Sequence, residues 1–587
     1  MKKTSNKSDE IIFEAIKIVP GLAIGPAHAF HRTSFHIDEF DHEIKDPDRE
    51  ITILDNAISE TVKQLKITID LNAQQLESHR SLFESHLALL EDDVLRKEIK
   101  EAIKQQNRSA AYAVIAVLQR KKEHFLNLED EYFRDRAFDI IDLKNRLLQT
   151  IAGVETDYSV SVPSIIFADH LSPSDTIHFD RKSILGFVTD TGGRTSHAAI
   201  MAKSMHIPYV VDNFSLAKLI QNSDYVILDG YEGNIIINPE QKTLDTYQKI
   251  RSKYLRSYSK LLKASSLPAI TQDGVAINIL ANIEFSDEIP EAKEVGANGI
   301  GLLRTETIFI EKEKVPTEQE QFEIFHEFAH QMAGQPVTIR TIDAGGDKII
   351  PELQGIEEEN PYLGWRAIRF CLDQPEIFKS HLRAIIRAND LGNIRILIPM
   401  IISLEEVEAT KQMIEEAKEE LIGEGMQFKP DIELGLMIET PAAVMMSQDL
   451  AAAVDFFSIG SNDLTQYTLA VDRTNNKIAP LFNDLHPAVL KLMRATVETA
   501  NKYQIGMSIC GEMAGNPEAI PVLLGLGFTE LSMVPGQIPV VKKIIRKLKI
   551  KQCYQLVDEI MQLNRVEEIK HLVATFIQKR FKELKDF

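Results

Sequence analysis

The sequence of 587 residues predicts a multidomain α/β protein made of a helical bundle, a small α/β unit and a (β/α)8 barrel. Three observations support this fold class. Residues 48–152 contain neither glycine nor proline, short strand-like apolar runs begin after residue 153, and about eight such runs alternate with helical stretches after residue 275. A chain of this length exceeds what one hydrophobic core organises, so we expect about three or four units.

Composition narrows the class of protein. The chain is 44% hydrophobic and 26% charged, as is typical of soluble globular proteins, and no uncharged apolar run approaches the ~18 residues of a membrane span. Charged residues interrupt any signal-peptide core near the N-terminus, and three scattered cysteines are too few for a disulfide framework. We therefore expect a cytoplasmic protein without membrane insertion. The net charge of -21 argues against nucleic acid as the main partner and favours a basic protein partner. The need for solubility would by itself also explain this charge.

The spacing of apolar residues changes twice in the first half of the chain. Residues 16–30 predict a strand and a turn around Pro20 and Gly21, whereas apolar residues at helical spacing between 48 and 152 predict a helical bundle. After Gly153 the strand-like runs predict a small α/β unit. These runs are residues 164–168, 184–188, 209–211, 225–228 and 235–237.

One histidine of this α/β unit has suggestive neighbours. His197 lies where a glycine turn meets the start of an apolar helical stretch, in Thr-Gly-Gly-Arg-Thr-Ser-His-Ala-Ala-Ile-Met at 191–201. Unpaired N–H groups and the helix dipole favour an anion there, and an imidazole is a competent nucleophile near neutral pH. The motif is therefore typical of a histidine that carries a phosphoryl group. Taken alone, a capping histidine without chemistry is the commoner explanation.

A connecting helix is predicted between the two halves of the chain. Apolar residues recur at helical spacing from 244 to 262, with lysines and arginines between them. A basic stripe with tyrosines is compatible with nucleic-acid binding, but a connecting helix with a solvated face explains the pattern better. Ser-Ser-Leu-Pro at 265–268 ends the helix and indicates a domain boundary.

The second half predicts a (β/α)8 barrel, whose active site would lie at the C-terminal ends of the strands. The strand-like runs are residues 275–280, 299–303, 337–341, 394–399, 433–438, 456–459, 506–509 and 530–533. Nearly every run is followed by a functional group. In chain order these are Asn282 and Glu284, Arg304 and Glu306, Arg340 and Asp343, Met400, Glu439, Ser461 to Asp463, Cys510 to Glu512, and Val534 to Gly536.

Arginines and carboxylates on this predicted rim indicate a metal–phosphate site. Arg304, Arg340, Arg366 and Arg473 offer guanidinium groups suited to phosphate and carboxylate, so the ligand would be a polyanion. Glu439 and Asp463 end neighbouring strands and could hold one Mg²⁺, although each alone is more commonly a helix cap or an ion-pair partner.

Cys510 lies on the same predicted rim, and its spacing leaves its role open. A thiol can serve as a general acid or as a nucleophile. A single buried cysteine is nevertheless more commonly structural. Its place between Ile509 and Gly511-Glu512 does not by itself distinguish these roles.

Several long motifs resemble those of one enzyme family. They are Gly-Gly-Arg-Thr-Ser-His at 192–197, Gly-Ile-Gly-Leu-Leu-Arg-Thr-Glu at 299–306, Arg-Thr-Ile-Asp-Ala-Gly-Gly-Asp-Lys at 340–348, Asn-Pro-Tyr-Leu-Gly-Trp-Arg-Ala-Ile-Arg at 360–369, Phe-Phe-Ser-Ile-Gly-Ser-Asn-Asp-Leu-Thr-Gln-Tyr at 456–467 and Cys-Gly-Glu-Met-Ala-Gly at 510–515. In these motifs the chain resembles enzyme I of the bacterial sugar phosphotransferase system, the phosphoenolpyruvate-protein phosphotransferases. Phe-Glu-Ser-His-Leu-Ala-Leu-Leu-Glu-Asp-Asp at 83–93 also resembles the family's insertion that binds the phosphocarrier protein HPr.

The resemblance implies a role for each matching residue. His197 would be phosphorylated at Nε2, Cys510 would be the proton donor, and Glu439 and Asp463 would bind Mg²⁺. The residues expected to contact phosphoenolpyruvate are Arg304, Arg340, Arg366, Asn462, Asp463 and Arg473.

The resemblance also implies the reaction, the partners and the domains. Phosphoenolpyruvate would phosphorylate the enzyme, which would pass the phosphoryl group to a histidine of HPr and release pyruvate. A homodimer through the barrel and a swivelling histidine domain are expected. The expected divisions are a phosphohistidine α/β domain at 1–47 and 153–240, a helical HPr-binding domain at 48–152, a connecting helix and linker at 241–270, and a phosphoenolpyruvate-binding barrel and dimerisation domain at 271–587.

Departures from the family pattern keep two alternatives open. Asp212-Asn213 stands where the family usually has Gly-Thr, Ile18-Val19-Pro20-Gly21 stands where a Ser-Xaa-Gly pattern is usual, and Val-Pro-Gly-Gln at 534–537 replaces small residues after the eighth strand. None removes an expected catalytic residue, but the last could alter the barrel mouth. One alternative is therefore a catalytically altered regulatory paralogue. The other is a dikinase-like phosphoenolpyruvate enzyme, although no convincing glycine-rich nucleotide loop is present.

Overall fold

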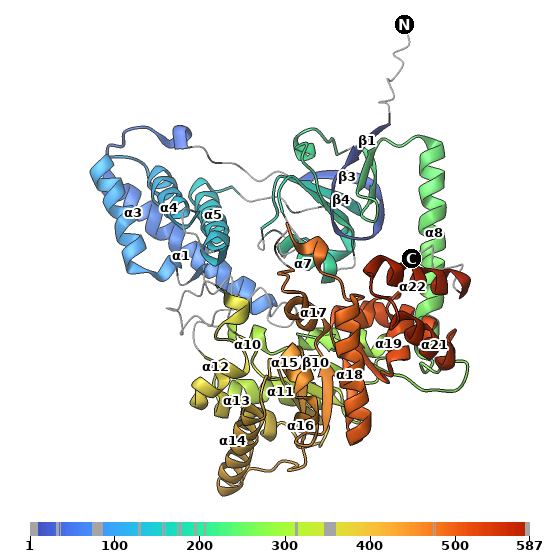
Figure 1. Ribbon diagram of the computed structural model, residues 1–587. Helices are drawn as coiled ribbons and strands as arrows, with labels where there is room; N and C mark the ends of the chain where they lie inside the picture. Colours follow the sequence, from blue (N-terminus) through green and yellow to red (C-terminus); the bar gives the residue numbers. More distant parts are fainter. Residues whose placement is uncertain are drawn as a thin grey trace. The chain divides into compact units, whose positions relative to one another are not determined.

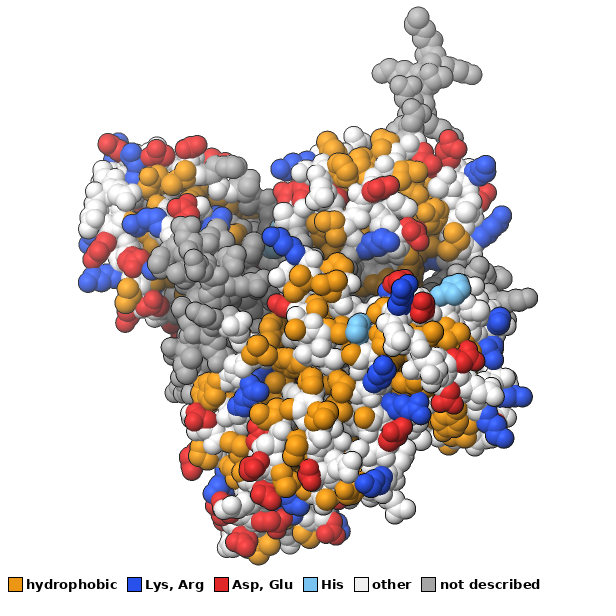
Figure 2. All heavy atoms as spheres, in the orientation of Figure 1, with side chains coloured by type: hydrophobic (Ala, Val, Ile, Leu, Met, Phe, Trp, Pro, Cys, Tyr) orange, Lys and Arg blue, Asp and Glu red, His pale blue; other side chains and the backbone are white. Residues whose placement is uncertain are grey.

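A computed structural model describes residues 10–30, 35, 37–72, 86–87, 89–126, 131–154, 158, 160–172, 175, 179–192, 197–204, 207–222, 224–310, 315–344, 360–473, 475 and 477–580. The chain divides into two compact units, Met1–Lys253 and Tyr254–Phe587 (Figure 1). Acidic and basic side chains are interspersed on the visible face of both units (Figure 2). Among the described residues, no helix combines the length and the apolar character that crossing a membrane requires.

The helical part of the first unit confirms the predicted bundle. Its helices are α1 (Pro47–Asn72), α3 (Asp93–Gln106), α4 (Ala110–Leu126) and α5 (Glu131–Ala152), after a short 3-10 turn, η1 (Ile37–Phe40). They share one apolar core, to which Leu54, Ile103 and Leu143 contribute completely buried side chains. Asp92 begins α3 by accepting a 2.8 Å hydrogen bond from the amide of Val94. Because glycine and proline are absent, nothing interrupts these helices internally.

The α/β part of this unit is an eight-stranded sheet in the order β1-β8-β7-β3-β4-β5-β6-β2. Its strands are β1 (Ile11–Glu14), β2 (Ile16–Val19), β3 (Leu22–Phe30), β4 (Ser164–Ala168), β5 (Ile184–Thr189), β6 (Tyr209–Val211), β7 (Tyr225–Asp229) and β8 (Asn234–Ile237). β3 pairs in parallel with β4, although the helical residues lie between them in sequence. Short 3-10 turns, η2 (Arg181–Ser183) and η3 (Leu216–Lys218), occupy two of the connections.

Helix α7 (His197–Ser204) begins at His197, in agreement with the predicted start of a helix. Ala198, Ala199 and Ala202 are buried in one cluster with Phe187 and Tyr209, because small side chains let the helix lie close to the sheet. Gly192 is needed in the preceding turn: its φ is +154°, and a Cβ there would lie 2.2 Å from the hydroxyl of Tyr209. The rest of the motif, residues 193–196, and the side chain of His197 lie outside the described parts.

Asp190, at the end of β5, provides a test of pH-dependent stability. Its Oδ1 atom is buried with no hydrogen-bond partner among the described residues. Burial, together with the negative charges of Asp212 and Asp169, raises the pKa of Asp190 to about 6. The folded protein therefore binds this proton more tightly than the unfolded chain does. The resulting stabilisation is present in acid, below the ordinary pKa of about 4, and is lost as the pH rises through about 6.

We expect Asp190→Asn to raise the unfolding temperature at pH 8 and to leave it nearly unchanged at pH 4. The gain at pH 8 should be about 1 kcal/mol or less, because the side chain is partly exposed and solvent screens the repulsion. Thermal unfolding followed by circular dichroism at the two pH values measures the difference. An equal shift at both values would contradict the electrostatic explanation.

Helix α8 (Gln241–Ser265) matches the predicted connecting helix. Leu244 and Tyr247, near its start, pack against Ile24 and Ile227 of the sheet. Leu262, near its end, packs against the core of the second unit. The helix thus contributes apolar side chains to both units, which explains its apolar spacing.

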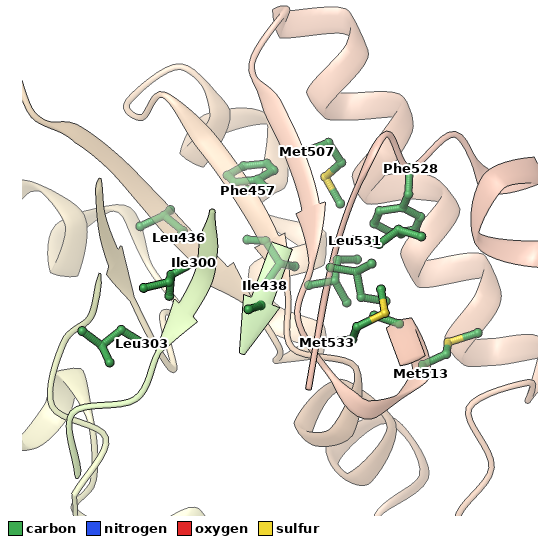
Figure 3. Packing of buried hydrophobic residues seen from close by; sticks show 14 of the residues in the cluster. Ile300, Leu303, Leu436, Ile438, Phe457, Met507, Met513, Phe528, Leu531 and Met533 are labelled. Carbon is green, nitrogen blue, oxygen red and sulfur yellow. The ribbon is translucent and has the colours of Figure 1, made fainter. Parts of the chain in front are cut away.

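The second unit is a closed barrel of eight parallel strands, which confirms the predicted fold class. Its strands are β9 (Asn278–Ile283), β10 (Ile300–Leu303), β11 (Val337–Arg340), β12 (Ile394–Ile398), β13 (Glu433–Ile438), β14 (Phe456–Ile459), β15 (Gly506–Ile509) and β16 (Glu530–Met533). Their apolar side chains, Ile300, Ile438 and Leu531 among them, pack in one continuous core (Figure 3).

Helices between and after these strands surround the barrel. They are α9 (Ile289–Glu294), α10 (Glu306–Ile310), α11 (Glu318–Gln331), α12 (Ile368–Asp373), α13 (Pro375–Arg387), α14 (Leu404–Gly423), α15 (Pro441–Met445), α16 (Ser447–Ala451), α17 (Ser461–Leu469), α18 (Pro487–Tyr503), α19 (Ile520–Leu526), α20 (Ile538–Ile545), α21 (Ile550–Ile560) and α22 (Val566–Arg580). Short 3-10 turns are η4 (Ser286–Glu288), η6 (Pro361–Leu363), η7 (Ala479–Leu481), η8 (Glu512–Gly515) and η9 (Pro535–Gln537).

The first barrel strand lies three residues later than predicted. The sequence predicts a strand at 275–280, whereas β9 runs from Asn278 to Ile283. The earlier apolar residues belong to a tight turn instead, in which Ile270 bridges Ala276 and Gly274 has a φ of +87°. Asn282 consequently lies within the strand rather than after it.

Candidate active site

Two carboxylates follow neighbouring strands of the barrel, as the sequence predicts. Glu439 comes directly after β13, and Asp463 lies in the first turn of α17, just after β14. Both are buried, with 1% and 8% of their surface exposed. The amide of Met400 donates a 2.7 Å hydrogen bond to Oε1 of Glu439, and Met400 adopts a φ of +60° there. One oxygen of Glu439 is therefore held by the backbone, which orients the other.

Glycine at position 460 makes room for the other oxygen of Glu439. A Cβ at Gly460 would lie 2.6 Å from Oε2 of Glu439 and 3.0 Å from its Cβ. Any larger residue would have to displace a buried carboxylate whose position is set by a backbone hydrogen bond. Gly460 is a site residue that the sequence prediction missed.

Arg340, the last residue of β11, is surrounded by carboxylates. It pairs with Glu306, and its Nη1 lies 3.2 Å from Oδ2 of Asp343. Burial alone would lower its pKa, but Glu306, Asp343 and Glu439 raise it above the ordinary value, so the guanidinium stays charged. Its Nε atom is buried with no hydrogen-bond partner in the part of the chain that the structure describes. A buried N–H without a partner is costly, and an anionic ligand would satisfy it.

Arg366 reaches the same cluster through Asp343. Its Nη2 donates to both oxygens of Asp343 at 2.7 and 2.9 Å, and its Nε donates to Oδ1 at 3.1 Å. Nη2 also lies 3.5 Å from Oδ2 of Asp463, and Nη1 donates a 3.4 Å hydrogen bond to the hydroxyl of Tyr467. Asp343 thus lies between Arg340 and Arg366 and orients both guanidinium groups.

The other two predicted arginines are more exposed. Arg304 has 41% of its side chain exposed and donates a 2.5 Å bond to Glu284, whereas Arg473 is 37% exposed and has Nη2 3.9 Å from Oδ1 of Asp463. The amide of Arg473 donates to Gln466 at 3.2 Å, which positions the loop after α17. Two buried arginines and two exposed arginines therefore share this end of the barrel, and the exposed pair has room to move toward a ligand.

The carboxylates of the cluster repel one another. Burial, reinforced by Asp463 and Asp343, raises the pKa of Glu439 above its ordinary value, although Arg340 and Arg366 oppose the rise. A divalent cation between Glu439 and Asp463 would relieve this repulsion. Oxygen donors are also what Mg²⁺ prefers, so the residues present fit such an ion.

Cys510 follows β15 and faces the barrel interior. Its side chain is buried among Leu302, Leu397, Met437 and Phe456, and its Sγ donates to the carbonyl of Ile459 at 3.6 Å. Burial raises the pKa of the thiol to about 11, against the lowering effects of Ser458, Arg340 and Arg304. At neutral pH the group is a protonated thiol, which suits an acid better than a nucleophile.

Polar side chains connect the loop of Cys510 to its neighbours. Asn282 donates to the carbonyl of Cys510 at 2.8 Å, and Ser532 donates to Asn282 at 2.5 Å. Asn462 accepts from the amide of Glu512 at 3.1 Å, so this predicted ligand residue also positions the loop. The unusual turn after β16 lies close by, because a Cβ on Gly515 would lie 1.5 Å from Oε1 of Gln537.

Ion pairs connect Arg340, Arg366, Asp463 and Arg473 through Asp343, and the pKa of Glu439 responds to the same charges. His197 belongs to the first unit, and its side chain lies outside the described residues. Asp343 and Glu306 appeared as groups that follow strands, but sequence reasoning assigned them no role. Gln466 and Tyr467 were missed; they lie three and four residues after Asp463 on α17, a spacing that places them on its face.

Comparisons with known proteins cover nearly the whole chain. Family models described as "PEP-utilising enzyme" match residues 14–136 (N-terminal), 160–233 (mobile domain) and 259–550 (PEP-binding domain). Three similar proteins are each named phosphoenolpyruvate-protein phosphotransferase. They come from Buchnera aphidicola subsp. Acyrthosiphon pisum (40% identical, covering 95% of this chain and 98% of the relative), Haemophilus influenzae (38%, covering 95% and 98%) and Bacillus subtilis (36%, covering 96% and 98%).

Proposed function

The chain belongs to the phosphoenolpyruvate-protein phosphotransferase family, and we propose that it phosphorylates His197 with phosphoenolpyruvate and passes the phosphoryl group to a histidine of HPr. Family membership makes the protein a phosphoenolpyruvate-dependent phosphotransferase. HPr as the acceptor, pyruvate as the product and the residue roles are the proposal. The observation that carries it is the cluster in which Asp343 holds Arg340 and Arg366 beside Glu439, Asp463 and Cys510.

The arginines would bind the phosphate and carboxylate of the substrate. Arg340 offers its Nε, which has no partner among the described residues, and Arg304 and Arg473 are exposed enough to turn toward the ligand. Arg366 holds its place through Asp343 and adds positive charge close to Asp463. Preorganised positive groups of this kind stabilise a transferring phosphoryl group, because they need no rearrangement as charge develops.

The proposed reaction breaks the bond between phosphorus and the enol oxygen and forms a bond from phosphorus to Nε2 of His197. The electron pair of the broken bond stays on the departing enolate. Cys510 then donates its proton to the methylene carbon, which yields pyruvate, and the thiolate recovers a proton from water. In the second reaction the phosphoryl group moves from His197 to the histidine of HPr.

Glu439 and Asp463 would hold Mg²⁺, which when bound supplies positive charge to the phosphate oxygens. Oε1 of Glu439 is engaged by Met400, and Gly460 leaves space at Oε2. The two carboxylates follow adjacent strands, β13 and β14, and are buried together. The choice of Mg²⁺ rests on this all-oxygen donor set.

We expect Gly460→Ala to raise the Mg²⁺ concentration needed for half-maximal phosphotransfer by about tenfold or more. The new Cβ would displace Oε2 of Glu439, which lies 2.6 Å away. Titrating Mg²⁺ in a phosphotransfer assay measures the change. Gly423→Ala is the matched control, because no atom of the described residues lies within 4 Å of where its Cβ would be. A Mg²⁺ dependence unchanged in both variants would contradict the assignment.

The proposal also assigns the partners and the domains. His197 has to meet both the barrel site and HPr, so its domain, residues 1–47 and 153–240, would swivel about the 241–270 helix and linker. The helical residues 48–152 would bind HPr, and the barrel, residues 271–587, would form a homodimer. The protein would act in the cytoplasm, where it would pass the phosphoryl group to HPr.

One labelling experiment tests the function. The purified protein is incubated with phosphoenolpyruvate labelled in the phosphate, with Mg²⁺, in the presence and absence of HPr. We expect acid-labile, base-stable label on the protein that passes to HPr as pyruvate accumulates. Label that arises only from ATP would support a dikinase-like enzyme. The absence of label with phosphoenolpyruvate would support a regulatory paralogue.

A further inference from the structure

A cluster of metal-ligating side chains lies on the outside of the barrel unit, among residues that the proposed reaction does not use. His326 and His330 are four residues apart on α11, so they lie on the same face of the helix. Asp390 comes from the loop between α13 and β12. Its Oδ2 lies 2.8 Å from Nε2 of His330 and 3.7 Å from Nε2 of His326. One ligand atom from each residue lies within 4.8 Å of the others, and the imidazole centres are 3.9 Å apart.

We propose that His326, His330 and Asp390 bind a transition metal ion such as Zn²⁺. Two imidazole nitrogens and one carboxylate oxygen form a donor set typical of Zn²⁺ and unlike the oxygen-only sites of Mg²⁺. Tetrahedral bonds of about 2.0–2.2 Å place ligand atoms about 3.4 Å apart, so the 2.8 Å pair would open by about half an ångström.

Solvent has access to all three ligands. Their side chains are 38%, 44% and 36% exposed for His326, His330 and Asp390. Water can therefore complete the coordination of a bound ion. The position near the end of α11 also favours a cation, because His330 lies in the last turn, where the helix dipole is negative.

The backbone around Asp390 is held firmly by its neighbours. Asn389 is completely buried, and its side chain donates to the carbonyls of Lys429 and Asp431 and accepts from the amide of Ile394. Asn393 donates to the carbonyls of Ala329, Met332 and Gln335 at the end of α11. These bonds fasten the loop of Asp390 to the helix that carries both histidines, so the ligands are positioned before a metal binds.

The basic residue in the last turn of α13, Arg387, is held by other groups. The guanidinium of Arg387 lies 4.3 Å from the ring centre of Phe322 and donates to Glu318 and Gln319, at the beginning of α11. Phe322 in turn packs against His326, with ring centres 5.2 Å apart. The contact with Phe322 thus supports the imidazole of His326. Arg387 pairs with the carboxylate of Glu318 and not with that of Asp390.

The site lies at the opposite end of the barrel from Glu439 and Cys510. His330 precedes the start of β11, and Asp390 precedes the start of β12, whereas the proposed active-site residues follow the ends of strands. A bound metal would join α11 to the loop after α13 and stabilise the folded barrel by mass action. It would do so without contacting phosphoenolpyruvate.

Zn²⁺ titration of the untagged full-length protein tests this site. Calorimetry and thermal unfolding are carried out in excess Mg²⁺, which competes for the oxygen site. We expect the unchanged protein to bind one more Zn²⁺ than His326→Gln/His330→Gln and to show an unfolding temperature that rises with Zn²⁺. Asp390→Asn should weaken this Zn²⁺ binding by about tenfold or more.

His571→Gln, which removes an exposed histidine of α22, should bind as the unchanged protein does. With Co²⁺ as the probe, visible absorption of a histidine-bound ion should appear in the unchanged protein and in this control, but not in the double variant. Equal Zn²⁺ stoichiometry and affinity in the double variant would overturn the proposal. So would the absence of Zn²⁺ binding to the unchanged protein.

Discussion

His197→Ala is expected to abolish phosphoenolpyruvate-dependent labelling of the protein and all transfer to HPr. The side chain supplies the nitrogen that forms the bond to phosphorus, and alanine offers no substitute, so the rate should fall by more than about 10⁴-fold. The position supports this role, because α7 begins at residue 197, and the positive end of a helix dipole favours an anion there. Autoradiography after incubation with labelled phosphoenolpyruvate measures the loss.

A second histidine provides the control for this experiment. His571→Ala removes an exposed imidazole from α22 and should leave the labelling unchanged. Phosphoenolpyruvate binding by His197→Ala should also persist, since the residues proposed to bind it lie in the other unit. Label that remains on His197→Ala would show that another residue accepts the phosphoryl group.

Cys510→Ala is expected to slow pyruvate release by about 10²–10⁴-fold while phosphoenolpyruvate still binds. The thiol is buried, and the rise of its pKa to about 11 keeps the proton available at neutral pH. Alanine retains the apolar packing against Leu302, Leu397 and Met437 but cannot donate a proton. Single-turnover measurements that follow pyruvate and phosphohistidine separately would detect the change. The thiol protonates the enolate after the phosphoryl group has left, so the formation of pyruvate is the step that should slow.

Cys553→Ala is the matched control, because Cys553 is also buried but lies on α21. It should release pyruvate at the unchanged rate, even if its stability falls. Unchanged turnover in Cys510→Ala would refute the role of the thiol as the acid and would leave it a structural residue of the barrel interior.

Much of the fold can be predicted from local patterns in the sequence. The period of apolar residues, the absence of glycine and proline from 48–152 and the alternation after 275 predict the bundle and the barrel, and both are present. The first barrel strand was misplaced because Val275 to Ile277 look like a strand, yet they pack in a turn that closes on Ile270. Apolar runs of this length are ambiguous until their partners are known.

The sequence by itself determined which chemistry the chain carries: a histidine at a helix start, arginines and carboxylates after parallel strands, and a thiol among them. Only the tertiary structure decided how these groups pair. Asp343 holds both Arg340 and Arg366, and Asp390 meets His326 and His330, through segments that are distant in sequence. The packing of such segments also leaves the Nε of Arg340 without a partner among the described residues. Periodicity constrains the face of a helix or strand, whereas such pairings depend on side-chain directions and on burial, which arise only when the whole unit packs.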